Sequence, residues 1–248
     1  MSRKSFRIAV LFLAAAGLCL TGCASMKAQP SQGTGFVPME EMKSNADYPF
    51  NKIWVKEDVD WDKYKTIYIA DVNTRYLMEA TWWQQNFRRQ DMERDTRTVA
   101  LSMQEKLREA FRNDSKKLYV VVDAPEPGSL TLQLALTELV PSNVVLEAVS
   151  LAAPYGSGLV VQAAAIESGA KSSVAFEAKV VDTDTGTVLV MLADRERGKV
   201  APINLRALTW YGEANLIISE WADQFVQVAN KHPGDVVKAA STFTLKPW

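Results

Sequence analysis

The sequence has few of the residues on which metal sites and catalytic triads depend. Its 248 residues include two cysteines and one histidine. Cys19 and Cys23 lie near the N-terminus, whereas His232 lies near the other end of the chain. Neither a zinc site nor a Ser/His/Asp triad finds a convincing set of ligands. We therefore expect a non-enzymatic protein with no catalytic residue, metal or cofactor, and we interpret His232 as a cation at the end of a helix.

Long apolar runs and an excess of positive charge are also missing. Beyond the N-terminus, no stretch reaches the ~18 uninterrupted apolar residues that a membrane-spanning helix needs. Lys and Arg together number 28 against 29 Asp and Glu, and a nucleic-acid-binding face requires a basic surplus. We therefore expect no nucleic-acid partner. A content of 48% hydrophobic and 23% charged residues is typical of a globular chain, and the length fits a single domain.

The N-terminus has the pattern of an export signal. Arg3, Lys4 and Arg7 precede an apolar run over 8–20, which is too short to span a bilayer and is typical of a cleaved signal peptide. The run ends in Leu20-Thr21-Gly22-Cys23, which resembles the bacterial lipobox. The resemblance implies a signal peptide over 1–22, cleavage between Gly22 and Cys23, and a diacylglyceryl group on the Cys23 thiol.

A lipidated Cys23 would fix the location of the protein. A thiolate is nucleophilic enough to be alkylated by a lipid donor, and Cys19 would be removed with the signal peptide, so no disulfide would remain. Two or three acyl chains such as palmitate, at about 0.8 kcal/mol per buried methylene, hold a protein on a bilayer essentially permanently. Ala24 and Ser25 follow the cysteine, where lipoproteins kept in the inner membrane carry Asp. We expect an outer-membrane lipoprotein of a Gram-negative envelope that faces the periplasm.

The rest of the chain divides into three parts by composition. Residues 23–50 are rich in Pro, Gly, Ser and Gln, which predicts a flexible tether. Residues 51–232 carry the periodic patterns of a globular domain, and 233–248 form a C-terminal tail.

The patterns in 51–232 predict a layered α+β domain. Alternation of apolar residues predicts strands at 66–70, 117–122 and 130–137, and a hairpin of 173–180 with 187–192 around a turn at 182–186. Helical spacing predicts amphipathic helices over 88–111 and 214–229. This order favours a mostly antiparallel sheet with both helices on one face.

Residues 141–170 form an unusual Ala-, Val- and Gly-rich insertion whose only charges are Glu147 and Glu167. It is compatible with two short helices or a hairpin. Either it packs on the open face of the sheet, or it covers a partner or a membrane. Gly156 and Gly158 lack the third glycine of a dinucleotide-binding fingerprint.

Three motifs have a functional and a structural interpretation. The tetrapeptide Asp184-Thr185-Gly186-Thr187 occurs in aspartic proteases, but these need two copies and the chain has one, while Asp and Gly also suit a hairpin turn. A calcium loop starting at Asp182 would need Glu where Ala193 stands. Trp82 and Trp83 could form an aromatic shelf for a glycan or peptide, although packing at a helix start explains them more simply.

Scattered aromatic and turn residues resemble a bacterial lipoprotein family known as domain of unknown function thirty-three thirteen. The residues that carry the resemblance are Gly35, Phe36, Trp54, Asp60, Trp61, Tyr64, Val181, Asp182, Thr185, Gly186, Asp194, Trp221 and Ala222. The resemblance implies an envelope lipoprotein with no assigned activity and no catalytic residues.

We therefore expect a membrane-anchored binding or scaffold module with a protein partner in the envelope. One alternative is a homo-oligomeric component of an export or pore assembly. A second is an aspartic-protease-like enzyme, which would rest on Asp184 alone.

Overall fold

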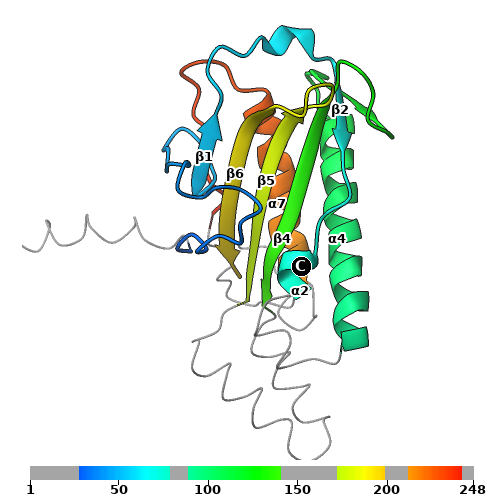
Figure 1. Ribbon diagram of the computed structural model, residues 1–248. Helices are drawn as coiled ribbons and strands as arrows, with labels where there is room; N and C mark the ends of the chain where they lie inside the picture. Colours follow the sequence, from blue (N-terminus) through cyan, green and yellow to red (C-terminus); the bar gives the residue numbers. More distant parts are fainter. Residues whose placement is uncertain (1–27, 79–88, 141–171, 199–211, 242–248) are drawn as a thin grey trace, which may run out of the picture.

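The computed structural model describes residues 28–78, 89–140, 172–198 and 212–241 (Figure 1). The expected signal peptide, Cys23, the pair Trp82 and Trp83, and the insertion 141–170 lie outside these residues.

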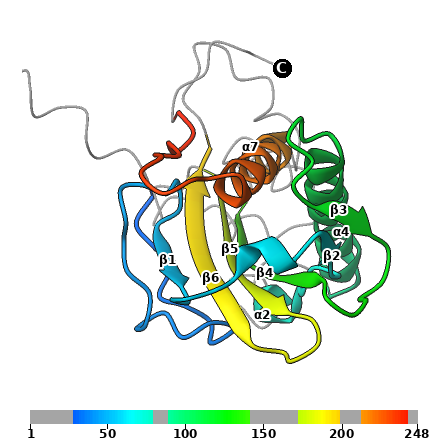
Figure 2. The same ribbon diagram turned by 90° about the horizontal axis from the view of Figure 1, so that it is seen from above.

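The described residues form a six-stranded sheet with two long helices on one face (Figures 1 and 2). The strands are β1 (Lys52–Val55), β2 (Thr66–Ile69), β3 (Val120–Val122), β4 (Leu130–Val140), β5 (Ser173–Asp182) and β6 (Val188–Arg197). The helices are η1 (Trp61–Lys63), α2 (Arg75–Met78), α4 (Arg89–Arg112) and α7 (Gly212–Ala229). The two predicted amphipathic helices correspond to α4 and α7, and the predicted hairpin corresponds to β5 and β6. These predictions are confirmed.

The sheet is mixed, whereas the sequence pattern predicts a mostly antiparallel one. Its order is β1-β6-β5-β4-β2-β3. The pairs β1–β6, β6–β5 and β5–β4 are antiparallel, but β2 lies parallel to both β4 and β3. The physical reason is α4, a helix of 24 residues, which carries the chain back along the sheet after β2. The next two strands, β3 and β4, therefore run in the direction of β2.

The main core lies between the sheet and the helices. Trp221 of α7 packs edge-on against Phe176 of β5 with ring centroids 4.7 Å apart, and Phe225 lies 5.4 Å from the same ring. Alternate residues of β4, from Leu130 to Leu136, complete this layer. The strand is not half-buried as its alternation predicts, because Thr131, Ala135 and Thr137 on its other face are buried too.

Residues 28–50 contribute to the cover of that other face. Their composition predicts a flexible linker, but Val37, Met39 and Met42 are buried against Met191 and Ala193 of β6. Apolar side chains placed between the Pro, Gly and Ser residues explain the difference, because their burial offsets the entropy of ordering the segment.

The start of the expected C-terminal tail packs as well. The backbone N–H of Val237 donates to the carbonyl of Asp47 at 3.0 Å, and the Val237 side chain is buried. Within the described residues, no helix is both long enough and apolar enough to cross a membrane.

Candidate functional site

An apolar pocket of about 430 Å³ lies between the sheet and the last turns of α4 and α7. Phe111 contributes from α4, and Phe225, Val228 and Ala229 contribute from α7. The sheet supplies a floor of aliphatic side chains from five strands, namely Ile53, Ile67, Leu130, Leu132, Val180, Val190 and Leu192. The volume falls in the range of small-molecule sites, which is roughly 300–1,000 Å³.

The rim of the pocket carries exposed apolar residues. Val55, at the end of the edge strand β1, is 37% exposed, and Leu118, before β3, is 44% exposed. Both line the pocket, together with the partly buried rings of Tyr48 and Trp61. An apolar molecule would therefore meet apolar surface at the rim as well as inside.

A few polar side chains also face the pocket. They are Asp62, Tyr119, Asn230, Lys231 and His232. Burial, together with the charges of Asp62 and Tyr64, raises the pKa of Tyr119, so its hydroxyl is protonated at neutral pH. The ammonium group of Lys231 lies 5.0 Å from the centre of the Tyr48 ring, a cation–π contact.

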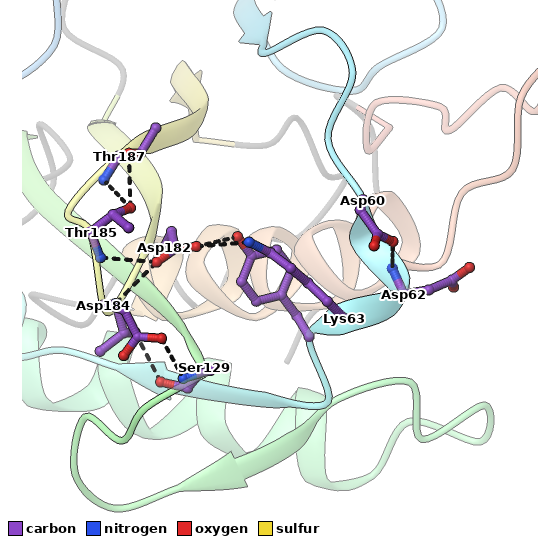
Figure 3. Close-up of polar contacts among 11 residues, drawn as sticks. Asp60, Asp62, Lys63, Ser129, Asp182, Asp184, Thr185 and Thr187 are labelled. Carbon is purple, nitrogen blue, oxygen red and sulfur yellow. Dashed lines mark hydrogen bonds and ion pairs between the residues drawn. The ribbon is translucent and has the colours of Figure 1, made fainter.

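Beside the pocket, Asp182 joins the β5–β6 turn to η1 (Figure 3). Its carboxylate accepts hydrogen bonds from the Tyr64 hydroxyl at 2.6 Å and from the Lys63 ammonium at 3.1 Å. It also accepts from the backbone N–H groups of Asp184 and Thr185, each at 3.0 Å. Asp182 thus connects the β5–β6 turn with Lys63 and Tyr64, which are distant from it in the sequence.

These contacts shift the ionisation of the groups involved. Hydrogen bonds from Tyr64, from the Thr185 backbone and from Lys63 hold the pKa of Asp182 well below its usual range. Hydrogen bonding with Tyr64 and Asp182 raises the pKa of Lys63 to about 12. Both groups are therefore charged at neutral pH. The arrangement is that of a structural ion pair with a hydrogen-bonded phenol.

The Asp-Thr-Gly motif lies in the β5–β6 turn. Asp184 accepts a hydrogen bond from the backbone N–H of Gly128 at 2.9 Å, which ties the turn to the segment before β4. Gly186 has a φ of 67°, the left-handed conformation that glycine adopts without steric cost. The turn conformation explains the glycine at position 186, and the hydrogen bond from Gly128 explains the aspartate at position 184.

Three further acidic residues make contacts that the sequence did not predict. Asp194, buried, accepts from the indole N–H of Trp221. Glu177, also buried, accepts from the backbone N–H groups of Thr34 and Val37. Glu138 holds Arg195 in a two-pronged ion pair with distances of 2.8–3.0 Å. An acidic residue within an apolar strand, as in Val174-Ala175-Phe176-Glu177, is the sequence feature that could have predicted such a buried carboxylate.

His232, expected from the sequence to be a cation at a helix end, is one of the residues that line the pocket. His232 is exposed after α7, and its backbone N–H donates to Asp235 at 2.9 Å. Across the described part of the chain, no three His, Cys, Asp or Glu side chains are grouped so that they could hold a metal ion.

The comparison with protein families is decisive for classification. The family model described as "Protein of unknown function (DUF3313)" matches residues 35–225. The chain belongs to this family. No curated protein matches the chain.

Solved structures give weaker similarity. The PelC dodecamer from Paraburkholderia phytofirmans shares 9% sequence identity, with a TM-score of 0.38, over 69% of this chain and 95% of that one. A single-substitution variant of the same protein shares 10% identity at the same score and covers 94% of that chain. Scores this low do not establish a shared fold.

Residues that carry the DUF3313 resemblance contact one another in the structure. Tyr64 bonds to Asp182, Trp221 bonds to Asp194, and the rings of Trp61 and Tyr64 lie 6.4 Å apart. These contacts fix the framework around the pocket, and only Trp61 among these residues lines it.

Proposed function

We propose that this DUF3313 chain is an outer-membrane lipoprotein, anchored through Cys23, whose periplasmic domain is a non-enzymatic binding module. Its binding site is the apolar pocket at the ends of α4 and α7. The observation that carries the proposal is the pocket itself, a space of about 430 Å³ with an aliphatic floor and exposed apolar residues at its rim.

The composition of the pocket supports a small apolar ligand. Ligand sites of this size bury most of the ligand against apolar side chains and use a few polar groups to fix its orientation. The aliphatic floor meets the first requirement, and the side chains of Asp62, Tyr119 and Asn230 meet the second. The buried acids described above are already engaged in contacts that hold the framework together.

The anchor keeps this module close to the membrane. Ala28, the first residue that the structure describes, is buried, and its carbonyl accepts a hydrogen bond from the Asn51 side chain at 3.3 Å. An extended chain spans at most ~3.6 Å per residue, so the segment from Cys23 to Ala28 reaches no more than about 18 Å. A lipidated Cys23 would thus hold the domain near the source of apolar envelope molecules.

Binding of N-phenyl-1-naphthylamine, an apolar dye that fluoresces in apolar surroundings, tests the proposal. The chain from Ala24 onwards contains every residue that the structure describes, and it needs no detergent. We expect saturable binding that Val190→Phe weakens at least about tenfold, because Val190 lines the pocket and a filled pocket excludes the dye.

Val188→Phe is the matched control. It lies on the same strand, two residues away, but the strand is irregular between the two residues, and Val188 packs in the cluster on the opposite face of the sheet. Dye binding that is absent from the wild-type chain, or that both substitutions weaken equally, would contradict the pocket as the binding site.

A further inference from the structure

We propose that the pocket selects apolar molecules with a cationic head, and that the Asp62 carboxylate and the aromatic rings at the rim of the pocket bind the cation. The ligand class is a lipophilic amine or a quaternary ammonium ion. This inference rests on the proposed function of the pocket and names the chemistry that the pocket recognises.

The Asp62 carboxylate is accessible to a ligand. Asp62 belongs to η1, is exposed and lines the pocket. Among the residues that the structure describes, no side chain or backbone group bonds to its carboxylate or forms an ion pair with it. After burial, its charge is the largest influence that raises the pKa of Tyr119, so the carboxylate lies close to another residue that lines the pocket. A cationic head can therefore pair with Asp62 without displacing another group.

Aromatic rings surround the same pocket. Those that line it, among the described residues, are Tyr48, Trp61, Phe111, Tyr119 and Phe225. The face of an aromatic ring attracts a cation, and groups of such rings recognise quaternary ammonium ligands. Lys231 shows this attraction within the chain, because its ammonium group lies 5.0 Å from the centre of the Tyr48 ring. No cation of the described segments lies over Trp61, which precedes Asp62 in η1, so that ring remains for a ligand.

The ends of the two long helices add negative potential. Phe111 lies in the last turn of α4, Val228 and Ala229 end α7, and all three line the pocket. The C-terminus of a helix carries the negative end of its dipole, which stabilises a nearby cation. Lys116 already makes such a contact, because its ammonium group donates to the Asn230 carbonyl just after α7 at 3.3 Å.

The cations of the chain that lie nearby do not neutralise Asp62. Lys63, the next residue in η1, forms an ion pair with Asp182 at 3.1 Å. Lys231 and His232 line the pocket, but neither forms an ion pair with Asp62. Asp62 is thus a charge that a ligand can neutralise at this pocket.

Three amphiphiles with the same decyl chain separate the charge of the head from apolar contact. Decyltrimethylammonium is a cation, 1-decanol is uncharged and decyl sulfate is an anion. Apolar partitioning alone favours the alcohol. We expect decyltrimethylammonium, below its micelle concentration, to displace N-phenyl-1-naphthylamine at about 2–5-fold lower concentration than 1-decanol, the factor that one exposed cation–π contact supplies. Decyl sulfate should be the weakest of the three.

Asp62→Asn and Asp60→Asn form a matched pair of variants. Each removes one negative charge from an exposed position, and Asn at position 60 can still cap η1. Only Asp62 lines the pocket. The preference for the cation should fall about 2–5-fold in Asp62→Asn, the factor that one exposed ion pair supplies, and should persist in Asp60→Asn. A preference that Asp62→Asn retains, or that both variants lose equally, would contradict the role of Asp62.

The failures of the two proposals give different results. If no probe binds at the pocket, the proposed function fails and takes this inference with it. If the amphiphiles bind the wild-type chain but the cation has no advantage over the alcohol, or if decyl sulfate binds best, cation selection is wrong and the pocket stands. The wild-type comparison needs no variant, so a poorly folded Asp62→Asn would not protect the proposal.

Discussion

The indole N–H of Trp221 donates to one carboxylate oxygen of Asp194 at 2.8 Å, and the backbone N–H of Asn51 donates to the other at 2.9 Å. The carboxylate is buried in strand β6. One acid therefore connects helix α7 with the segment that leads into β1. Since both Trp221 and Asp194 belong to the residues that carry the family resemblance, we interpret that resemblance largely as a record of structural constraints.

Trp221→Phe should destabilise the domain by about 1–3 kcal/mol, because it removes a hydrogen bond to the buried carboxylate of Asp194. Urea unfolding followed by circular dichroism measures the change. Trp61→Phe is the control at a partly exposed ring and should cost less. Equal losses in the two variants would show that ring size, and not the hydrogen bond to Asp194, determines the effect.

Asp182 should make stability depend on pH in the acid range. Its pKa is lower in the folded chain than in the unfolded chain. The stabilisation is therefore complete above the ordinary Asp pKa of ~3.9 and is lost as pH falls below that value. Asp182→Asn should be less stable than the wild-type chain by about 1–3 kcal/mol at pH 7, and the gap should narrow steadily below about pH 4.

Urea midpoints measured from pH 7 down to about pH 2 test this prediction. Asp184→Asn is the control, because Asp184 is exposed and accepts a single hydrogen bond from Gly128. A constant gap between Asp182→Asn and the wild-type chain over the whole range would mean that Asp182 is not the titrating group.

Glu177 should hold the N-terminal segment on the sheet. Its two carboxylate oxygens accept from Thr34 and Val37, with the backbone bonds at 2.6 and 3.1 Å. In Glu177→Ala, amide hydrogen exchange in 34–39 should become faster, while exchange in α7 should change little. Glu41→Ala removes an exposed acid from the same segment and should leave the exchange unchanged. Faster exchange throughout the domain would instead indicate global destabilisation.

Membrane attachment should depend on Cys23 alone. Only the thiol can carry the lipid, so Cys23→Ala should move the protein from the membrane pellet to the soluble fraction after cell breakage. Cys19→Ala should stay with the membrane, since Cys19 lies within the expected signal peptide. A Cys23→Ala protein that still pellets with outer membranes would refute the lipid anchor.

Local periodicity predicts a large part of this fold. α4 and α7 bury one face at helical spacing, and the β5–β6 hairpin has alternating strands around an Asp- and Gly-containing turn. β1 was not predicted, because Ile53, Trp54 and Val55 are three consecutive apolar residues and show no alternation. The parallel placement of β2 also could not be predicted, since strand direction depends on where α4 returns the chain.

The candidate site was less accessible to prediction. The residues that line the pocket range from Tyr48 to Pro233. A pocket depends on how side chains from distant segments pack together, and a local sequence pattern does not predict that packing.

Native mass spectrometry of the full-length protein, gently extracted from its own membranes, tests the central claim most directly. Wild-type protein should carry the mass of the acyl chains on Cys23 and, in addition, a small bound molecule, whereas Val190→Phe should keep the acyl chains and lose that molecule. A lipidated wild-type protein with no small molecule, or one that Val190→Phe retains equally, would contradict the pocket as the functional site of this lipoprotein.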